Sequence, residues 1–103
     1  MVAGTNTDLS RALAGRVADL VRERSLSLRG TVRVSIEIAM REAPFQGSKA
    51  MTTDYVATVR TGDLEHTFEG HLLGFAELTL RNGVIEQAAA EIVSYLANAP
   101  NAR

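Results

Sequence analysis

The sequence contains no cysteine and no tryptophan, a single lysine, Lys49, and only 5% aromatic residues. The lack of cysteine excludes disulfide bonds, a disulfide-linked partner, thiolate catalysis and cysteine-ligated zinc or iron–sulfur sites, and it fits a reducing compartment. No apolar run approaches the length of a membrane-spanning helix, and the opening MVAGTNTDLS has neither segment of a secretion signal. We therefore expect a soluble cytoplasmic protein without membrane association.

Neither sign of charge dominates the composition. The 103 residues include 11 basic and 12 acidic side chains, for a net charge of −1. Nucleic acids and anionic membranes are therefore not attracted in general, and binding them would need a local basic patch. An apolar content of 46% is ordinary for a folded protein. The length predicts a single α+β domain, which we place at residues 8–97 between flexible tails at 1–7 and 98–103.

Two segments have the apolar spacing of amphipathic helices. The first begins near Thr7 or Asp8, either of which can cap it, and its apolar residues recur at steps of three and four up to Val21. The second, VIEQAAAEIVSYLANA, starts at Val84 and ends near Asn98. Each has one apolar stripe, so each needs another layer to pack on.

Between these helices the apolar period changes to two residues, which predicts strands. Residues 31–41, TVRVSIEIAMR, alternate strictly except at Ala39. Similar alternation predicts a second strand at residues 51–60 and a third at 63–69, before and after the dipeptide Thr61-Gly62. Each predicted strand has an apolar face, which the helices can cover, and a polar outer face.

The dipeptide Thr61-Gly62 predicts a tight hairpin with a two-residue loop. In that register the inner faces of the two strands agree, since apolar or aromatic groups meet. His66 takes the parity of the core, so we expect a hydrogen-bonded core histidine rather than a catalytic one. The predicted pairs are Arg60 with Asp63, Val59 with Leu64, Ala57 with His66, and Tyr55 with Phe68.

Residues 72–81 fit both a strand and a short helix. Alternating apolar and polar side chains ahead of the turn-forming dipeptide Asn82-Gly83 favour a fourth strand. Leucines at helical spacing make the helix the alternative. We favour the strand because Leu78 would lie off the helical stripe. The expected fold is an α+β two-layer sandwich with an N-terminal helix, a three- or four-stranded antiparallel sheet and a C-terminal helix.

The outer face of the predicted sheet is a candidate functional surface. It is rich in threonine and mixed in charge, as a solvated antiparallel face usually is. It lacks the exposed aromatic residues and the basic track of sheets that bind single-stranded nucleic acid. Its residues are Arg33, Ser35, Glu37, Arg41, Thr52, Asp54, Val56, Thr58, Arg60, Glu65, Thr67, Glu69 and His71.

The predicted order of helix, three strands and helix is similar to that of double-stranded RNA-binding domains, and EQAAAEIVSYL resembles their alanine-rich last helix. A related order occurs in ribosome-hibernation factors. The segment RNGVIEQ lacks the lysine cluster that would hold phosphates, so nucleic acid is not the expected partner. The resemblance implies, as an alternative, a weak nucleic-acid-associated or ribosome-associated factor. Its arginines would be Arg11, Arg16 and Arg22 of the first helix with Arg33 and Arg41.

Metal or small-molecule binding is a third hypothesis. Glu65, Glu69 and His71 share the outer face, and the last two are close enough along a strand to reach one ion. No third close ligand is identifiable, and a solvated edge explains these residues better. We find no catalytic motif, and we expect neither a cofactor nor a metal.

The loop at residues 42–50 combines a rigid residue, Pro44, with a large apolar one, Phe45, where the chain should be exposed. Aromatic residues in loops are common contact points, although Phe45 folding back over the sheet edge is an equal alternative. Our leading hypothesis is a non-enzymatic interaction or assembly protein. It would bind a protein partner or another copy of itself through a sheet edge, the outer face or this loop. The residues assigned to the contact are Pro44, Phe45, Lys49, Arg33, Arg41 and Thr58.

Overall fold

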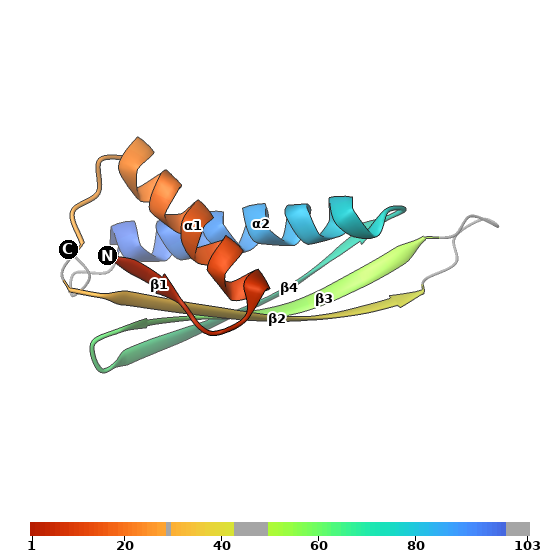
Figure 1. The fold of residues 1–103 in the computed structure, drawn as a ribbon, viewed down its shortest axis with the longest axis horizontal. Helices are drawn as coiled ribbons and strands as arrows, with labels where there is room; N and C mark the ends of the chain where they lie inside the picture. Colours follow the sequence, from red (N-terminus) through yellow and green to blue (C-terminus); the bar gives the residue numbers. More distant parts are fainter. Residues whose placement is uncertain (29, 43–49, 99–103) are drawn as a thin grey trace.

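A computed structural model describes residues 1–28, 30–42 and 50–98. Both helices lie on one face of a single four-stranded sheet whose strand order is β1-β2-β3-β4 (Figure 1). The expected α+β arrangement of helix, sheet and helix is therefore confirmed. In these ranges, helix length and apolar content fall short of what a membrane crossing needs. The elements are β1 (Val2–Gly4), α1 (Asp8–Glu23), β2 (Val32–Glu42), β3 (Met51–Thr61), β4 (Leu64–Gly74) and α2 (Glu77–Asn98).

The helix α1 begins as the sequence predicts. The side-chain oxygen of Thr7 accepts a hydrogen bond from the backbone N–H of Ser10 at 3.1 Å, which satisfies one of the free donors of the first turn. Leu13 and Val17 on the apolar stripe are fully buried against the sheet and α2. The helix therefore gains most of its stability from packing rather than from local preference.

The prediction of a flexible tail at residues 1–7 is wrong for Val2–Gly4, which form β1 and pair in parallel with residues 32–34 of β2. The sheet is thus mixed rather than wholly antiparallel. A Cβ atom on Gly4 would lie 2.6 Å from the carbonyl oxygen of Ser10, so only glycine lets the chain pass this close to α1. At the other end Asn98 closes α2, and the rest of the predicted tail lies outside the described residues.

The predicted fourth strand ahead of Asn82-Gly83 is wrong, because this segment is the start of α2. Leu80 and Val84 lie four residues apart and are both buried, so they extend the apolar stripe of the helix. Leu78 does lie off that stripe and is 71% exposed. Burial of the stripe outweighs the turn preference of the dipeptide, since tertiary packing overrides local propensity.

The hairpin of β3 and β4 is confirmed, but its turn starts one residue later than predicted, at Gly62. Gly62 has φ of 59°, and a type II′ turn needs this positive value at its first central residue. Each β3 residue consequently faces a β4 residue two positions further on, so Tyr55 faces Gly70 rather than Phe68. A shift of two residues leaves every side chain on its predicted face.

Tyr55 ties α2 to the sheet. Its ring lies against Gly70, where a Cβ atom would be 2.5 Å from the tyrosine hydroxyl oxygen. That hydroxyl donates a hydrogen bond to the Glu91 carboxylate and accepts one from the side-chain N–H of Gln87 at 2.8 Å. Burial, together with the hydrogen bond to Glu91, raises the pKa of Tyr55 to about 12. The helix is thereby held over β3 and β4.

Candidate functional site

The edge of the sheet at β2 is covered over its first half. The N–H of Val32 donates to the carbonyl of Met1 at 2.8 Å, and the N–H of Thr5 donates to the carbonyl of Val34 at 3.2 Å. Beyond β1, the N–H of Ile36 donates to the side-chain oxygen of buried Ser10 at 3.0 Å. Backbone groups that would otherwise face solvent are therefore already paired.

The edge at β4 is different. In the part of the chain that the structure describes, β4 pairs with β3 on one side and with no strand on the other. A two-residue turn is closed by a hydrogen-bonded pair, here Thr61 and Leu64, and hydrogen-bonded pairs alternate along an antiparallel ladder. Every second backbone unit of β4 therefore points away from β3. We call these units the β4 edge; they belong to Glu65, Thr67, Glu69, His71 and Leu73.

The sequence of β4 carries little protection against pairing. Natural edge strands are usually short, bulged, or marked by proline or lysine. β4 has 11 residues, LEHTFEGHLLG, against a usual length of about five or six, and it contains neither proline nor lysine. It pairs with β3 in one continuous register. Its charged side chains are Glu65 and Glu69 on the outer face, so the strand is long, regular and open to a partner.

A groove runs beside this strand, between β4 and α2. It encloses about 500 Å³. The added strand of a partner directs alternate side chains to opposite faces of a sheet, so every second side chain would enter this groove. We call it the α2 groove; it is lined by Phe68 of β4 and by Ala90, Glu91, Ser94, Tyr95 and Asn98 of α2.

His66 belongs to the aromatic group at the α2 groove rather than to the core. It has the predicted inward parity but is exposed. Its ring stacks on Tyr95 with centres 4.8 Å apart and meets Phe68 edge-on at 4.6 Å. The prediction of a hydrogen-bonded core histidine is wrong, because β4 is an edge strand and α2 covers only part of its inner face.

Exposed apolar side chains continue past the end of β4. Leu73 on the outer face, Phe75 in the connection and Leu78 in the first turn of α2 are all well exposed, with Phe75 at 68%. Sequence reasoning missed them, because it assigned this segment to a further strand. They enlarge the apolar area next to the β4 edge.

On the outer face, two of the predicted contact residues come together in a hollow of about 400 Å³. Arg33 on β2 faces Arg60 on β3, and in the next row Ser35 faces Thr58. Arg60 is held by Glu65, with 2.6 Å between the guanidinium and the carboxylate. Like charges opposite each other destabilise a strand pair, and Glu65 reduces that repulsion at Arg60.

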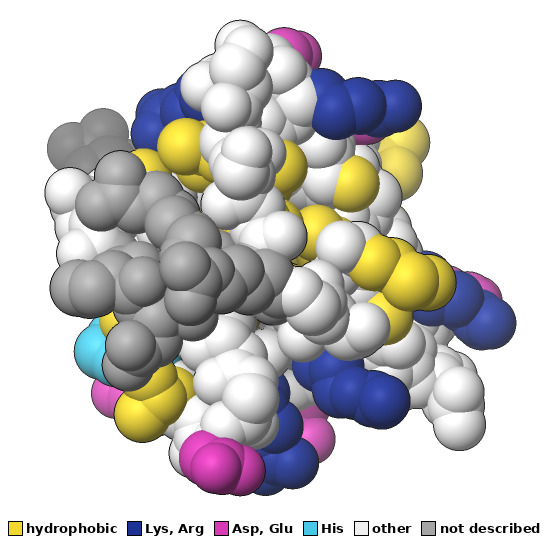
Figure 2. Space-filling model, turned by 90° about the vertical axis from the view of Figure 1, so that its left-hand side faces the viewer, with side chains coloured by type: hydrophobic (Ala, Val, Ile, Leu, Met, Phe, Trp, Pro, Cys, Tyr) yellow, Lys and Arg dark blue, Asp and Glu magenta, His cyan; other side chains and the backbone are white. Residues whose placement is uncertain are grey.

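The arginines of the nucleic-acid alternative are not brought together. Arg11, Arg16 and Arg22 lie on α1 above the sheet, whereas Arg33 and Arg41 lie on the opposite, outer face. Figure 2 shows charged side chains of both signs scattered around one end of the molecule. Most of these arginines also have acidic partners: Arg11 pairs with Asp8, Arg16 with Glu86, Arg22 with Asp19 and Arg41 with Asp54.

The metal candidate is not assembled either. Glu65 is paired with Arg60, and Glu69 lies opposite Val56 rather than a second ligand. Only His71 faces an acidic residue, Asp54, on the neighbouring strand. Within the described ranges, no group of three histidine, aspartate or glutamate side chains could hold a metal ion.

The predicted contact loop is not covered by the structure. Pro44, Phe45 and Lys49 lie outside the described residues, so the choice between contact and fold-back stays a prediction.

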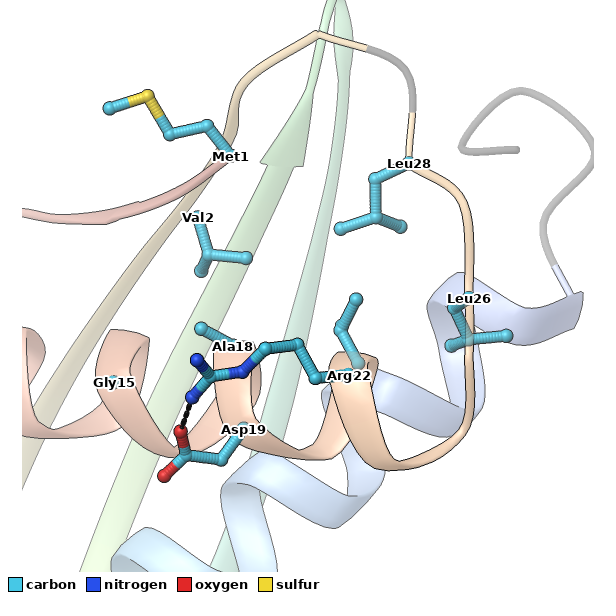
Figure 3. A pocket seen from close by; sticks show the side chains of 9 residues that line it. Met1, Val2, Gly15, Ala18, Asp19, Arg22, Leu26 and Leu28 are labelled. Carbon is cyan, nitrogen blue, oxygen red and sulfur yellow. Dashed lines mark hydrogen bonds and ion pairs between the residues drawn. The ribbon is translucent and has the colours of Figure 1, made fainter.

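A second hollow, of about 430 Å³, lies between α1, β1 and the segment that follows α1 (Figure 3). The side chains of Val2, Leu26 and Leu28 point toward it, and the ion pair of Arg22 with Asp19 lies along its rim. Its lining is mostly apolar and includes no histidine. The sequence gave no sign of it, because it exists only where β1 packs beside α1.

No protein-family model matches the chain, and no curated protein matches it in sequence.

Proposed function

We propose that this chain is a non-enzymatic interaction module that binds an extended protein segment by adding it as a strand to the β4 edge. The observation that supports this most is the open, regular 11-residue edge strand. The proposal places the module in the cytoplasm, in keeping with its cysteine-free sequence.

The two faces of the added strand would meet different surroundings. On the helix side, alternate side chains would enter the α2 groove and pack on Phe68 and Tyr95, which favours apolar residues. On the outer side, they would lie next to Glu65 and Glu69, which favours polar or basic residues. Backbone hydrogen bonds would supply affinity, and this alternation would supply specificity.

Thr67→Pro tests the proposal without dismantling the sheet. The N–H of Thr67 points away from β3, and proline is tolerated in an edge strand where its missing N–H faces solvent. Peptides selected from a displayed random library on the wild-type protein should show apolar and polar residues in alternation. The same peptides should lose binding to Thr67→Pro but not to the matched control Thr67→Ala.

Amide hydrogen exchange locates the contact. On peptide binding, the outward amides of Thr67, Glu69 and His71 should become protected, whereas amides that already bond to β3 should change little. If selected peptides bind Thr67→Pro as well as they bind the wild type, or protect α1 instead of β4, the proposal is wrong.

A further inference from the structure

Resting on the edge-binding function proposed above, the identity of one β4 ligand follows from how β4 can pair with itself. Two identical strands related by a two-fold axis run antiparallel, and each contact then occurs twice. The outward units of one copy meet the outward units of the other, so the axis can pass through any residue of β4. The residue on the axis decides which side chains face each other.

Charge excludes two positions near the middle of the strand. An axis at Glu69 places this residue opposite itself, and an axis at Thr67 places Glu65 opposite Glu69 twice. An axis at Phe68 instead places Glu65 opposite His71 twice and Glu69 opposite Thr67. The outer side chains then match without a like-charge pair.

The inner face favours the same axis. With the axis at Phe68, the two Phe68 rings meet and Leu64 of each copy faces Leu72 of the other. Leu64 is 44% exposed in the single chain, so this register covers apolar surface that is otherwise in water. An axis at Gly70 also pairs Glu69 with His71, but it sets two glycines at the centre and leaves Leu64 without a partner residue.

The α2 groove completes the fit. Phe68 lines the groove together with Tyr95, and it packs edge-on to that ring with centres 6.0 Å apart. With the axis at Phe68, the second copy brings its own Phe68 alongside this aromatic pair. We infer that the strand received by β4 is β4 of a second copy, joined antiparallel about a two-fold axis at Phe68. The two sheets then form one continuous sheet of eight strands, with four contributed by each copy.

Single cysteines can measure this register, because the natural chain has none. Facing residues in a hydrogen-bonded antiparallel pair have Cα atoms about 5.5 Å apart, within the range of a disulfide. A mixture of Thr67→Cys and Glu69→Cys should therefore form a mixed disulfide under mild oxidation. Each variant alone should form much less, since its own cysteines would not face each other. A mixture of Glu69→Cys and His71→Cys reports the axis at Gly70, so preferential cross-linking there would overturn the register.

Sedimentation over a concentration series measures the association itself. Thr67→Pro removes one outward donor from each copy, hence two hydrogen bonds from the dimer, and should raise the dimer Kd at least about tenfold. Thr67→Ala should stay near the wild type. A chain that remains monomeric at every concentration, while selected peptides still protect the β4 amides, overturns the second copy as ligand and leaves edge binding intact. If neither peptide nor second copy binds at β4, both proposals fail.

Discussion

The two edges of this sheet differ in how their backbone groups are treated. At β2, a three-residue strand and the Ser10 side chain pair the N–H and C=O groups along the first half of the edge. At β4, an 11-residue strand leaves every second backbone unit unpaired by any described strand. A covered edge needs close approach by other parts of the same chain, whereas an open edge needs only a regular strand. The first is a structural device, and the second is an opportunity for binding.

The largest expected effect comes from closing the space that lets β1 cover β2. Gly4→Ala should lower the free energy of unfolding by about 3 kcal/mol, because its Cβ would lie 2.6 Å from the carbonyl oxygen of Ser10, and backbone cannot move aside as a side chain can. Urea unfolding followed by circular dichroism measures this change. Gly15→Ala is the matched control, since a Cβ there meets nothing within 4 Å. Equal stability of the two variants would show that β1 does not depend on the close approach.

Tyr55 should make stability depend on alkaline pH, because its pKa is about 12 in the folded chain and about 10 in the unfolded one. The folded state holds the phenolic proton more tightly, so this contribution is complete below pH 10 and is lost as the pH rises through about 12. Two pKa units correspond to roughly 3 kcal/mol. The stability difference between wild type and Tyr55→Phe should shrink by that amount between these pH values. A difference that stays constant with pH would mean that Tyr55 does not hold α2 in this way.

Ser10→Ala should cost about 2 kcal/mol, because the Ile36 N–H would lose its buried acceptor. Chemical denaturation gives the loss, and amide exchange at Ile36 should accelerate more than exchange at Tyr55 in the centre of the sheet. Ser94→Ala serves as control, since Ser94 is an exposed serine of α2. Uniform acceleration across the sheet would argue against local protection of the β2 edge.

The smallest expected effect is at the open edge. Thr67→Pro should change the stability of the single chain by less than about 1 kcal/mol, since its N–H has no bond to β3 to lose. Phe68→Pro, one residue along, should cost about 3 kcal/mol or more because it removes a ladder hydrogen bond. Thermal unfolding of dilute protein compares the two variants. Similar losses in both would contradict the assignment of outward and inward backbone units.

Much of the layer structure could be predicted from local pattern. The period of two in residues 31–41 assigns Val34 and Ile36 to the core, and the structure buries both. The hairpin was predicted with correct faces and a register in error by two residues, because parity is local while the placement of the turn depends on the positive φ of Gly62. The outer face was likewise predicted as a set.

Other features needed partners far away in sequence. The segment around Leu78 is helical because Leu80 and Val84 find a core to enter, and β1 exists because Gly4 passes close to Ser10. The candidate site belongs to this class. The strand LEHTFEGHLLG shows that an edge would lack proline and lysine, but not that β4 would be an edge.

By itself, the sequence determined which residues face the core and which face water, since strand and helix periodicity follow from backbone geometry within a few residues. It also determined an antiparallel hairpin and two helices to cover one face. Only the tertiary structure decided which edge is covered and which is open, where the α2 groove lies, and that His66 is exposed beside Tyr95. Those properties depend on the order of strands and on close approaches between distant segments, which local patterns do not encode.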